Sequence, residues 1–237
     1  IKHIRKLKDK KYRDESNEYV VEGVKLVEEA VKENAKIKQI IVCEDTTRTY
    51  EIPTHIMLEI AKYECISVSD KIFNIITQVT NPQGIMAIIE KNAQNAKIDY
   101  TQDIIVVLDD VQDPGNLGTI IRSAKAFNID TVVLSLGCVK KYNEKVIRAA
   151  QGMLFKVNVV TKDLKYFIPY LKENGYSVYG TCVTNGTDIS TLKKNKKLAV
   201  VMGNEGQGIS YDIKKELDKN VYINMNDDCE SLNVAVA

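Results

Sequence analysis

The chain of 237 residues has no tryptophan, only two histidines and no closely spaced pair of cysteines. His3 and His55 lie beside no cysteine and form no H-x-x-x-H pair, which argues against a zinc site. An odd, scattered set of cysteines in a chain of this length is typical of free thiols in a reducing compartment. The five cysteines are Cys43, Cys65, Cys138, Cys182 and Cys229.

Long apolar runs are also missing. No run approaches the roughly 18 residues that a membrane span needs, and no signal-type apolar region follows the charged N-terminus. The hydrophobic fraction of 44% is ordinary for a globular protein, and the length suits two modest domains. We therefore expect a soluble protein of the cytoplasm with no membrane contact.

An excess of one charge is lacking as well. The net charge of +1 excludes a molecule that is strongly basic throughout, as many nucleic-acid binders are. The distribution is uneven, however, because residues 1–13 hold seven basic residues against one acid, Asp9. Such a basic arm can neutralise phosphates, and its alternative is a solvated face of a terminal helix. The pattern alone leaves both interpretations open.

Helical and strand patterns alternate through the first ninety residues. Apolar spacing predicts a helix over 24–31 and strands over 37–42 and 84–90. Two further helices are predicted over 56–63 and 71–79. Residues 91–103 are polar and poor in large apolar side chains, which is typical of a linker. The sequence thus predicts a small α/β unit followed by a connection to a second unit.

A regular α/β rhythm begins at residue 104. Near-continuous apolar strands that alternate with helices predict a parallel sheet covered on both faces. The predicted strands are 104–108, 131–135, 157–160, 177–182, 198–202 and 221–225. The predicted helices are 116–127, 143–151, 164–174 and 209–217.

The first of three informative segments is Asn116-Leu-Gly-Thr-Ile-Ile-Arg122, which follows a strand and a turn at Asp113-Pro-Gly. Asn116 is placed to cap the new helix, and Arg122 is expected on about the same helix side. An arginine directed toward the strand end can bind a phosphate or a developing oxyanion. The alternative is a capped helix with an ordinary surface arginine.

The second segment is Gly203-Asn-Glu-Gly-Gln-Gly208, directly after a strand. Its glycines allow the backbone to approach a ligand closely. The spacing is neither a dinucleotide-binding fingerprint nor a P-loop. Glu205 would repel a pyrophosphate and better suits an arginine, a ribose hydroxyl or a cationic ligand. A plain tight turn is the alternative.

The third segment is Ser231-Leu-Asn233, which follows an acidic loop and precedes small apolar residues. Taken alone, Ser231 and Asn233 are best interpreted as residues that cap a helix. Each of the three segments follows a buried strand, so we expect all three at one end of a single sheet, where open α/β folds bind ligands.

Together and in this order, the three segments resemble the motifs of the SpoU/TrmH class of the SPOUT superfamily, which are S-adenosylmethionine-dependent RNA ribose 2′-O-methyltransferases. The resemblance covers nearly the whole chain. It implies an RNA substrate-binding domain over 1–92, a linker over 93–103 and a catalytic α/β domain over 104–237. It also implies that the catalytic domain carries a C-terminal trefoil knot. The chain stops at Ala237, inside the helix expected after Ser231, so we expect that helix to be cut short.

The resemblance also implies roles for individual residues. The catalytic set would be Asn116, Arg122, Glu205, Ser231 and Asn233, with Asn116 and Glu205 orienting Arg122. An arginine is always protonated, so Arg122 would anchor a phosphate and stabilise an alkoxide. The cofactor S-adenosylmethionine would contact Gly203, Ile223 and Leu232, with Thr181, Cys182, Met225 and Gly208 as further candidates. RNA would bind Lys6, Lys8, Lys10, Lys11, Arg13 and Arg122.

The implied assembly is a homodimer that acts on RNA without a metal ion. Ribosomal RNA, in particular 23S rRNA, is the expected substrate, with transfer RNA as the alternative. A non-catalytic RNA-binding module of the same fold is the competing interpretation. A phosphotransferase is a third, and it lacks a P-loop lysine and metal-binding carboxylates in the right places.

Overall fold

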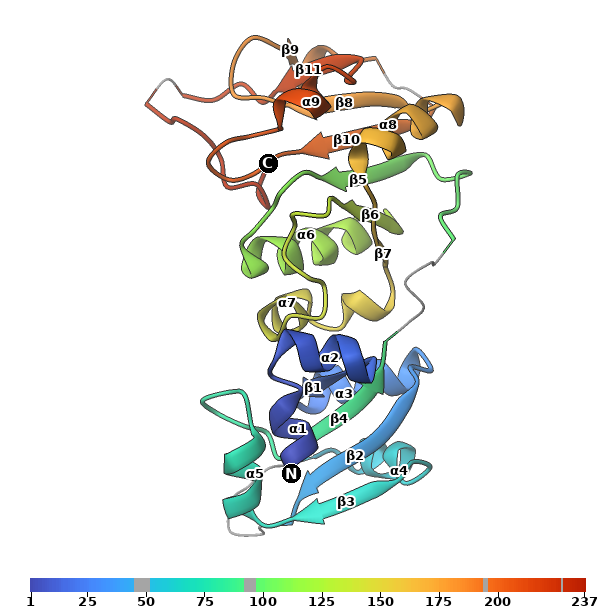
Figure 1. Ribbon diagram of the computed structural model, residues 1–237, viewed down its shortest axis with the longest axis vertical. Coiled ribbons are helices and arrows are strands. Elements are labelled where there is room, and N and C mark those ends of the chain that lie inside the picture. Colours follow the sequence, from blue (N-terminus) through green and yellow to red (C-terminus); the bar gives the residue numbers. More distant parts are fainter. Residues whose placement is uncertain (45–51, 92–96, 194–195, 227) are drawn as a thin grey trace.

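Two β-sheets organise the computed structural model, which describes residues 1–44, 52–91, 97–193, 196–226 and 228–237. The smaller has four strands in the order β1-β4-β2-β3, and the larger has seven in the order β7-β6-β5-β10-β8-β11-β9. Figure 1 shows the two sheets stacked along the long axis of the molecule, with helix α7 near their junction. Each sheet carries its own helices.

The N-terminal unit confirms the predicted mixture of helices and strands. Its central strand β4 is antiparallel to β1 and β2, while β3 is parallel to β2. Strands β1 and β3 were not predicted. The elements are α1 (Lys2–Lys6), α2 (Lys10–Ser16), β1 (Glu18–Glu22), α3 (Val24–Lys32), β2 (Ile37–Cys43), α4 (Thr54–Ile60), β3 (Cys65–Val68), α5 (Asp70–Ile76) and β4 (Ile85–Glu90).

The C-terminal unit confirms the predicted parallel sheet, since every strand pair in it is parallel. Its first elements are β5 (Ile104–Leu108), α6 (Pro114–Ala126), β6 (Thr131–Leu134), α7 (Glu144–Ala150), the 3-10 helix η1 (Met153–Phe155), β7 (Asn158–Thr161) and α8 (Leu164–Glu173). The remaining elements are β8 (Ser177–Thr181), β9 (Thr187–Asp188), η2 (Ile189–Thr191), β10 (Leu198–Met202), α9 (Tyr211–Lys214) and β11 (Lys219–Tyr222).

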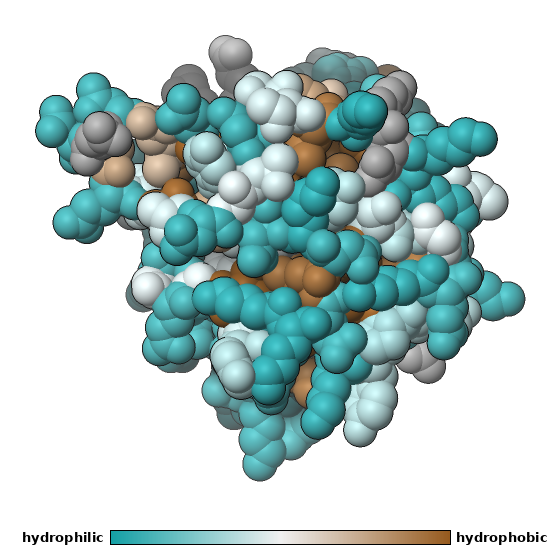
Figure 2. Space-filling view, turned by 90° about the horizontal axis from the view of Figure 1, so that it is seen from above, coloured by the Kyte–Doolittle hydropathy of each residue, from teal (hydrophilic) through white to brown (hydrophobic). Residues whose placement is uncertain are grey.

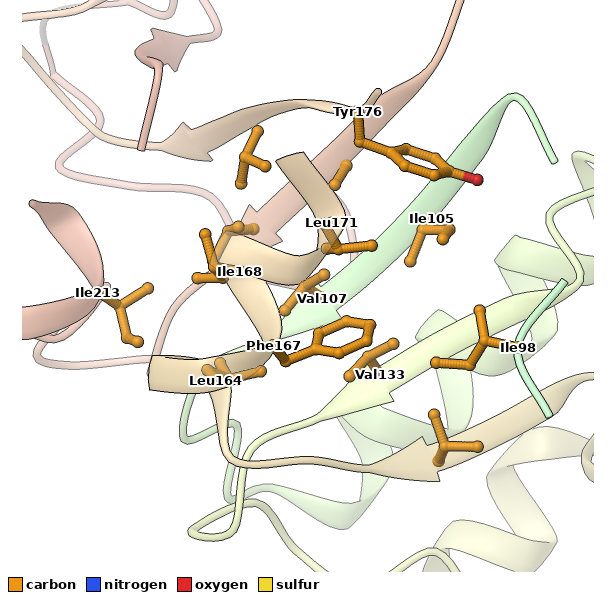
Figure 3. Close-up of a cluster of buried hydrophobic side chains, with 14 of the residues drawn as sticks. Ile98, Ile105, Val107, Val133, Leu164, Phe167, Ile168, Leu171, Tyr176 and Ile213 are labelled. Atoms are coloured by element: carbon orange, nitrogen blue, oxygen red, sulfur yellow. The ribbon is translucent and has the colours of Figure 1, made fainter. Parts of the chain in front are cut away.

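Side chains of β5 explain why the central strands β5 and β10 of this sheet are apolar throughout. Ile105 and Val107 belong to the cluster beneath α8, which Figure 3 shows with Leu164, Phe167 and Leu171. Val106 and Leu108 belong to the cluster beneath α6 and α7 on the other face. Successive residues of a strand point to opposite faces, so both positions must be apolar when helices cover both.

Two predicted boundaries were wrong near the C-terminus. The strand predicted over 221–225 is β11, at Lys219–Tyr222, and the helix predicted over 209–217 shortens to α9, at Tyr211–Lys214. Asp218 ends the helical stretch, because its backbone N–H donates to the carbonyl of Val178 and its carboxylate accepts from the Val178 N–H. The chain therefore enters the sheet earlier than its apolar pattern suggests.

Lys91, which the sequence assigned to the start of the polar connection, belongs to the packed N-terminal unit. It is 6% exposed, and its Nζ lies 2.6 Å from an Asp14 carboxylate oxygen. Residues 93–96 of the predicted linker lie outside the described residues. The face in Figure 2 is mostly polar, with a narrow apolar band near its centre. No helix in the described ranges is long and apolar enough to cross a membrane.

Candidate active site at the strand ends

The first two segments meet because β5 and β10 are neighbours in the sheet. Leu108 is in register with Met202, and the Asp109 N–H donates to the Met202 carbonyl at 2.8 Å. The loop after β5 therefore begins beside the loop after β10. The buried carboxylate of Asp109 also accepts from the Ser210 N–H at 2.8 Å, which ties the end of the glycine loop to the same place.

A chain of side-chain hydrogen bonds joins all three segments. Asn116 Nδ2 donates to Glu205 Oε1 at 3.0 Å, and Asn116 Oδ1 accepts from Asn233 Nδ2 at 2.9 Å. These partners are 89 and 117 residues away from Asn116 in the sequence. The expectation that the three segments share one end of the sheet is thereby confirmed. We call this set, Glu205, Asn116 and Asn233, the relay.

Glu205 is the anchor of the relay. Besides Asn116, its carboxylate accepts from the backbone N–H groups of Asp113, at 3.1 Å, and Gln112, at 3.3 Å. Desolvation acts to raise the pKa of Glu205, but the hydrogen bonds from Asn116 and the backbone outweigh it, so the pKa is lowered. Glu205 is therefore held ionised with both oxygens occupied.

The prediction that Asn116 caps α6 was wrong. Asp113 is the N-cap, and its Oδ1 accepts from the Asn116 backbone N–H at 2.8 Å. Pro114 then occupies the first helical position, where its missing N–H costs nothing. Because Asp113 performs the capping, the side chain of Asn116 is free to bridge the other two segments.

The glycine loop is a tight turn whose ends touch. Asn204 and Gly208 form an antiparallel bridge, and a Cβ on Gly203 would lie 2.2 Å from the backbone of Ile209. Only glycine fits at 203 for that reason. Gly208 has a positive φ of 68°, which glycine adopts freely. The turn holds Glu205 at its exposed tip, facing the start of α6.

In the third segment, Asn233 and not Ser231 caps the terminal turn. Asn233 Oδ1 accepts from the Ala235 N–H at 2.8 Å, and Ser231 is exposed with no hydrogen bond to a described residue. Val234 and Ala235 pack against the apolar cluster beneath α6. The segment thus returns from β11 to the face of the sheet that α6 covers.

Arg122 lies apart from the relay. It is exposed and makes no hydrogen bond or ion pair with a described residue. Six residues of helix turn the side-chain direction by about 240°, so Asn116 and Arg122 project about 120° apart and not from one side. The expectation that Asn116 and Glu205 orient Arg122 is therefore not met by a direct bond. Its guanidinium is left available for an external anion.

Most candidate cofactor residues cluster at the carboxyl ends of β8, β10 and β11. The Cys182 N–H donates to the Val221 carbonyl at 2.9 Å, which places the ends of β8 and β11 side by side. Backbone groups of Gly203 and the half-buried apolar side chains of Ile223 and Met225 suit a nucleoside with a short apolar chain. Thr181 ends β8, Leu232 is partly exposed in the third segment, and Gly208 closes the turn.

Two structural residues of the site were missed from the sequence. Asn204 Nδ2 donates to the Asp110 carbonyl at 2.8 Å, and its Oδ1 accepts from the N–H groups of Gly206 and Gln207. Asp109 binds the Ser210 N–H as described. Their position in the sequence could have identified them, because each is a polar side chain within two residues of the carboxyl end of a buried strand.

The basic arm consists of exposed lysines and one buried arginine. Lys6, Lys8, Lys10 and Lys11 are exposed, although Lys8 Nζ donates to the Thr77 carbonyl at 3.0 Å and Lys6 lies over the Tyr12 ring. Arg13 is only 9% exposed, and its Nη1 donates to the carbonyls of Leu7 and Lys8. The prediction that Arg13 contacts RNA conflicts with this burial, because its guanidinium closes the end of α1.

The candidate site contains neither a metal-ligand cluster among the described residues nor the cleft that the structure shows. Within the described ranges, no three His, Cys, Asp or Glu side chains come together as a metal site. A cleft of about 300 Å³ lies elsewhere, at the junction of the two units. It is lined by Lys141, Tyr142, Leu154, Phe155, Lys156, Val157, Asn158 and Val159. The candidate site is therefore a set of converging loops.

Comparison with known proteins agrees with this geometry. The model of the SpoU rRNA methylase family matches residues 103–237, and that of the MRM3-like substrate binding domain matches residues 1–87. The 23S rRNA (guanosine(2553)-2′-O)-methyltransferase RlmP of Bacillus subtilis is 36% identical over 237 residues, covering 100% of this chain and 92% of that protein.

Solved structures agree over the full length. An AdoMet-bound rRNA methyltransferase from Sinorhizobium meliloti has a TM-score of 0.85 at 28% identity, covering 99% of this chain and 89% of that one. The SpoU methyltransferase AviRb from Streptomyces viridochromogenes shares the fold, with a TM-score of 0.86 at 22% identity, 100% of this chain and 92% of that one being covered. The chain belongs to the SpoU rRNA methylase family and is an RNA methyltransferase of that class.

Proposed function

We propose that this protein transfers a methyl group from S-adenosylmethionine to a ribose 2′-hydroxyl of RNA, and that its substrate is 23S rRNA. The observation that carries the proposal is the relay, which joins Asn116, Glu205 and Asn233, while the exposed Arg122 lies further along the same helix as Asn116. An RNA-binding module has no need of this arrangement. The Bacillus subtilis relative, named as a 23S rRNA 2′-O-methyltransferase, supports the choice of substrate.

The two units divide the work in this proposal. Residues 1–92 bind the RNA substrate, residues 93–103 connect the units, and residues 104–237 carry out the transfer. The protein acts in the cytoplasm, where ribosomal RNA is made, and its cysteines are free thiols within the described ranges. It works as a homodimer, which analytical ultracentrifugation of the purified protein tests through the expected doubling of mass.

A trefoil knot in the C-terminal unit is part of the same proposal. It is supported by the return of Val234 and Ala235 from the end of β11 to the apolar cluster beneath α6. Knots are otherwise rare in proteins. Pulling a single molecule by its two ends tests it, because a knotted chain remains shorter than its full extended length after complete unfolding.

Arg122 is the residue that meets the reacting ribose. When bound, S-adenosylmethionine would supply a methyl group on a sulfonium, and its methyl–sulfur bond would break as the bond to the ribose 2′-oxygen forms, with the sulfur leaving as a neutral thioether. The guanidinium of Arg122 is a cation, so it binds the neighbouring phosphate and stabilises negative charge on the 2′-oxygen as the hydroxyl proton passes to solvent water. A free, exposed side chain is what this role requires, because the RNA must reach it.

The relay and Ser231 prepare the surroundings of the ribose. Glu205 accepts three hydrogen bonds and its lowered pKa makes it a weak base, so it acts by fixing Asn116 and the start of α6 and not as a proton acceptor. Asn233 is fixed in turn through Asn116. Ser231 has a free hydroxyl that can donate to the ribose. The cofactor is bound at the ends of β8, β10 and β11, through Gly203, Ile223, Leu232 and their neighbours.

Transfer of a labelled methyl group tests the proposal. Purified protein should label rRNA, and R122A should lower the rate by about a hundredfold or more, since one electrostatic donor is lost. R122A should keep its melting temperature and its affinity for S-adenosylmethionine. T119A, an exposed change on the same helix, is the matched control. Undiminished transfer by R122A would remove Arg122 from the reaction.

Mapping 2′-O-methyl groups in RNA from cells with and without the gene identifies the target. A single missing methyl group in 23S rRNA is the expected result. A missing methyl group in tRNA would show that the substrate is tRNA and not 23S rRNA, while the proposed ribose methylation would stand. Calorimetry that detects no binding of S-adenosylmethionine would contradict the proposal and favour a non-catalytic RNA-binding module.

A further inference from the structure

Helix α7 lies between the N-terminal unit and helix α6 (Figure 1). On its N-terminal-unit side, Ile147 is 4% exposed and belongs to the same apolar cluster as Tyr19, Val21 and Leu26 of that unit. Leu154 and Phe155, just beyond α7, pack against this cluster too. The core of the N-terminal unit therefore extends into the C-terminal unit, so the two are not merely tethered.

Polar contacts fix the register of this junction. Lys156 Nζ lies 2.8 Å from a carboxylate oxygen of Glu29 and 3.4 Å from one of Glu33. Arg148 Nη1 donates to the Gln78 carbonyl at 3.3 Å. The rings of Tyr19 and Tyr142 stack with centroids 4.4 Å apart. We call these contacts, together with Ile147, the seam.

The opposite side of α7 touches α6 at Gly118. A Cβ added to Gly118 would lie 2.4 Å from the Ala149 Cβ and 2.8 Å from the Val146 carbonyl oxygen. The helix backbones are therefore as close as glycine permits. Gly118 lies two residues after Asn116 and four before Arg122, so this contact sets the position of both side chains.

We propose that α7 is a rigid spacer that fixes Arg122 and the relay relative to the RNA-binding unit, and so determines which ribose is methylated. The inference rests on the proposed function and adds how the target nucleotide is selected. An unbroken series of packed contacts runs from the core of the N-terminal unit through Ile147 to Gly118. A fixed distance between an RNA contact and the reacting group selects one nucleotide at that distance. Gly118 and Lys156 act in this scheme as positioning residues.

A charge swap tests the seam. K156E places three acids together, and it should lower the rate of transfer to the native site by about tenfold to a hundredfold, since small misplacements are costly. Methylation should also spread to neighbouring nucleotides, while the affinity for S-adenosylmethionine stays unchanged. E29K combined with K156E restores an ion pair and should recover the rate and the single site. K165E, an exposed change of equal charge on α8, should behave like the unaltered protein.

A distance measurement tests the spacer without any methyl transfer. One spin label is attached to Cys65 and a second to Y166C, with the other four cysteines replaced by serine. The protein should give one narrow distance distribution, K156E should broaden it, and the double variant should narrow it again. A broad distribution before K156E is introduced would overturn the proposal, whether or not any RNA is methylated.

Gly118 provides the test on the other side of α7. G118A should lower kcat while leaving the RNA KM and the affinity for S-adenosylmethionine unchanged, because the added methyl group shifts α6 and not the RNA-binding unit. A149G in the same chain removes the nearest clashing atom and should restore part of kcat.

If K156E opens the junction yet leaves the transfer rate and the methylated site unchanged, the spacer is refuted. If the unaltered protein methylates no RNA, the proposed function fails, and the spin-label distances still decide whether the spacer exists.

Discussion

Glu205 shows at the scale of one residue how the site depends on ionisation. Its pKa is lowered, so the stability that its hydrogen bonds contribute is present above the ordinary pKa of a glutamate and is lost as pH falls through the folded value. The carboxylate accepts hydrogen bonds from three N–H groups, which can donate but cannot accept a hydrogen bond. A glutamine at this position would place its own N–H₂ group against one of these N–H donors, and that hydrogen bond would be lost.

We therefore expect E205Q to melt at a lower temperature than the unaltered protein at pH 7. The difference should shrink as pH is lowered below about 4.5, because the glutamate then loses its charge as well. Differential scanning calorimetry between pH 3 and pH 7 measures this. E173Q, an exposed change on α8, should show no such difference. A gap between E205Q and the unaltered protein that is constant with pH would contradict the role assigned to the carboxylate.

At the scale of elements, two helices of the C-terminal unit each begin with an aspartate N-cap. Comparing them distinguishes the effect of a cap on stability from its effect on function. Asp113 caps α6 and Asp163 caps α8, each by accepting a backbone N–H with its side chain. Only α6 carries Asn116 and Arg122. The start of α6 is also where Glu205 binds, so its geometry matters to the site and that of α8 does not.

D113A and D163A should each lower the free energy of unfolding by about 1 kcal/mol, the usual cost of losing an N-cap. D113A alone should also lower methyl transfer, because the first turn that holds Asn116 loosens. Urea unfolding and labelled-methyl assays on both variants check this, and D113N should largely keep both properties. Equal activity in D113A and D163A would mean that the cap has no part in placing Asn116.

Elements were predictable from the sequence where one periodicity dominated. The central strands β5 and β10 of the larger sheet are continuous apolar runs because helices cover both faces, and most strands of the sheet were located to within a residue or two. Strand β1 escaped prediction because Glu18 and Glu22 flank a core of only three apolar residues beside a helical pattern. The cap of α6 was misassigned to Asn116 because asparagine and aspartate both suit that role, and only the tertiary contact to Glu205 and Asn233 distinguishes them.

For the whole molecule, the low net charge hides a local excess of exposed lysines in α1 and α2. The exposed lysines of α1 and α2 lie on the N-terminal unit, while Arg13 of the same segment is buried. Each phosphate contact releases counterions, so binding to RNA should weaken as salt rises. A variant at Lys10 should therefore change the affinity for RNA, whereas a variant at Arg13 should change the stability of the fold.

K10A combined with K11A should reduce the slope of log affinity against log salt by about 1 to 2, as expected for the loss of one or two phosphate contacts. R13A should instead lower the free energy of unfolding by about 1–3 kcal/mol, because two backbone carbonyls lose their donor. Fluorescence anisotropy of labelled rRNA at several salt concentrations and urea unfolding measure the two effects. A salt slope unchanged by K10A and K11A would place the RNA on another surface.

The relay could be anticipated from the sequence only as a gathering of polar residues at strand ends. Its connections required the fold, because the strand order that brings β10 beside β5 is not encoded in any local pattern. The separation of Arg122 from Glu205 also required coordinates. Arg122 lies six residues after Asn116 on α6, and at 3.6 residues per turn its side chain diverges from that of Asn116, which binds Glu205.

The order of the three segments along the chain has a consequence for synthesis. The relay links residues near positions 116, 205 and 233, so a chain still being made at the ribosome holds only an open, incomplete version of it until the last segment emerges. The strands of the N-terminal sheet, in contrast, are all synthesised by residue 90. A nascent molecule thus completes its N-terminal unit long before it gains the arrangement that holds Asn116.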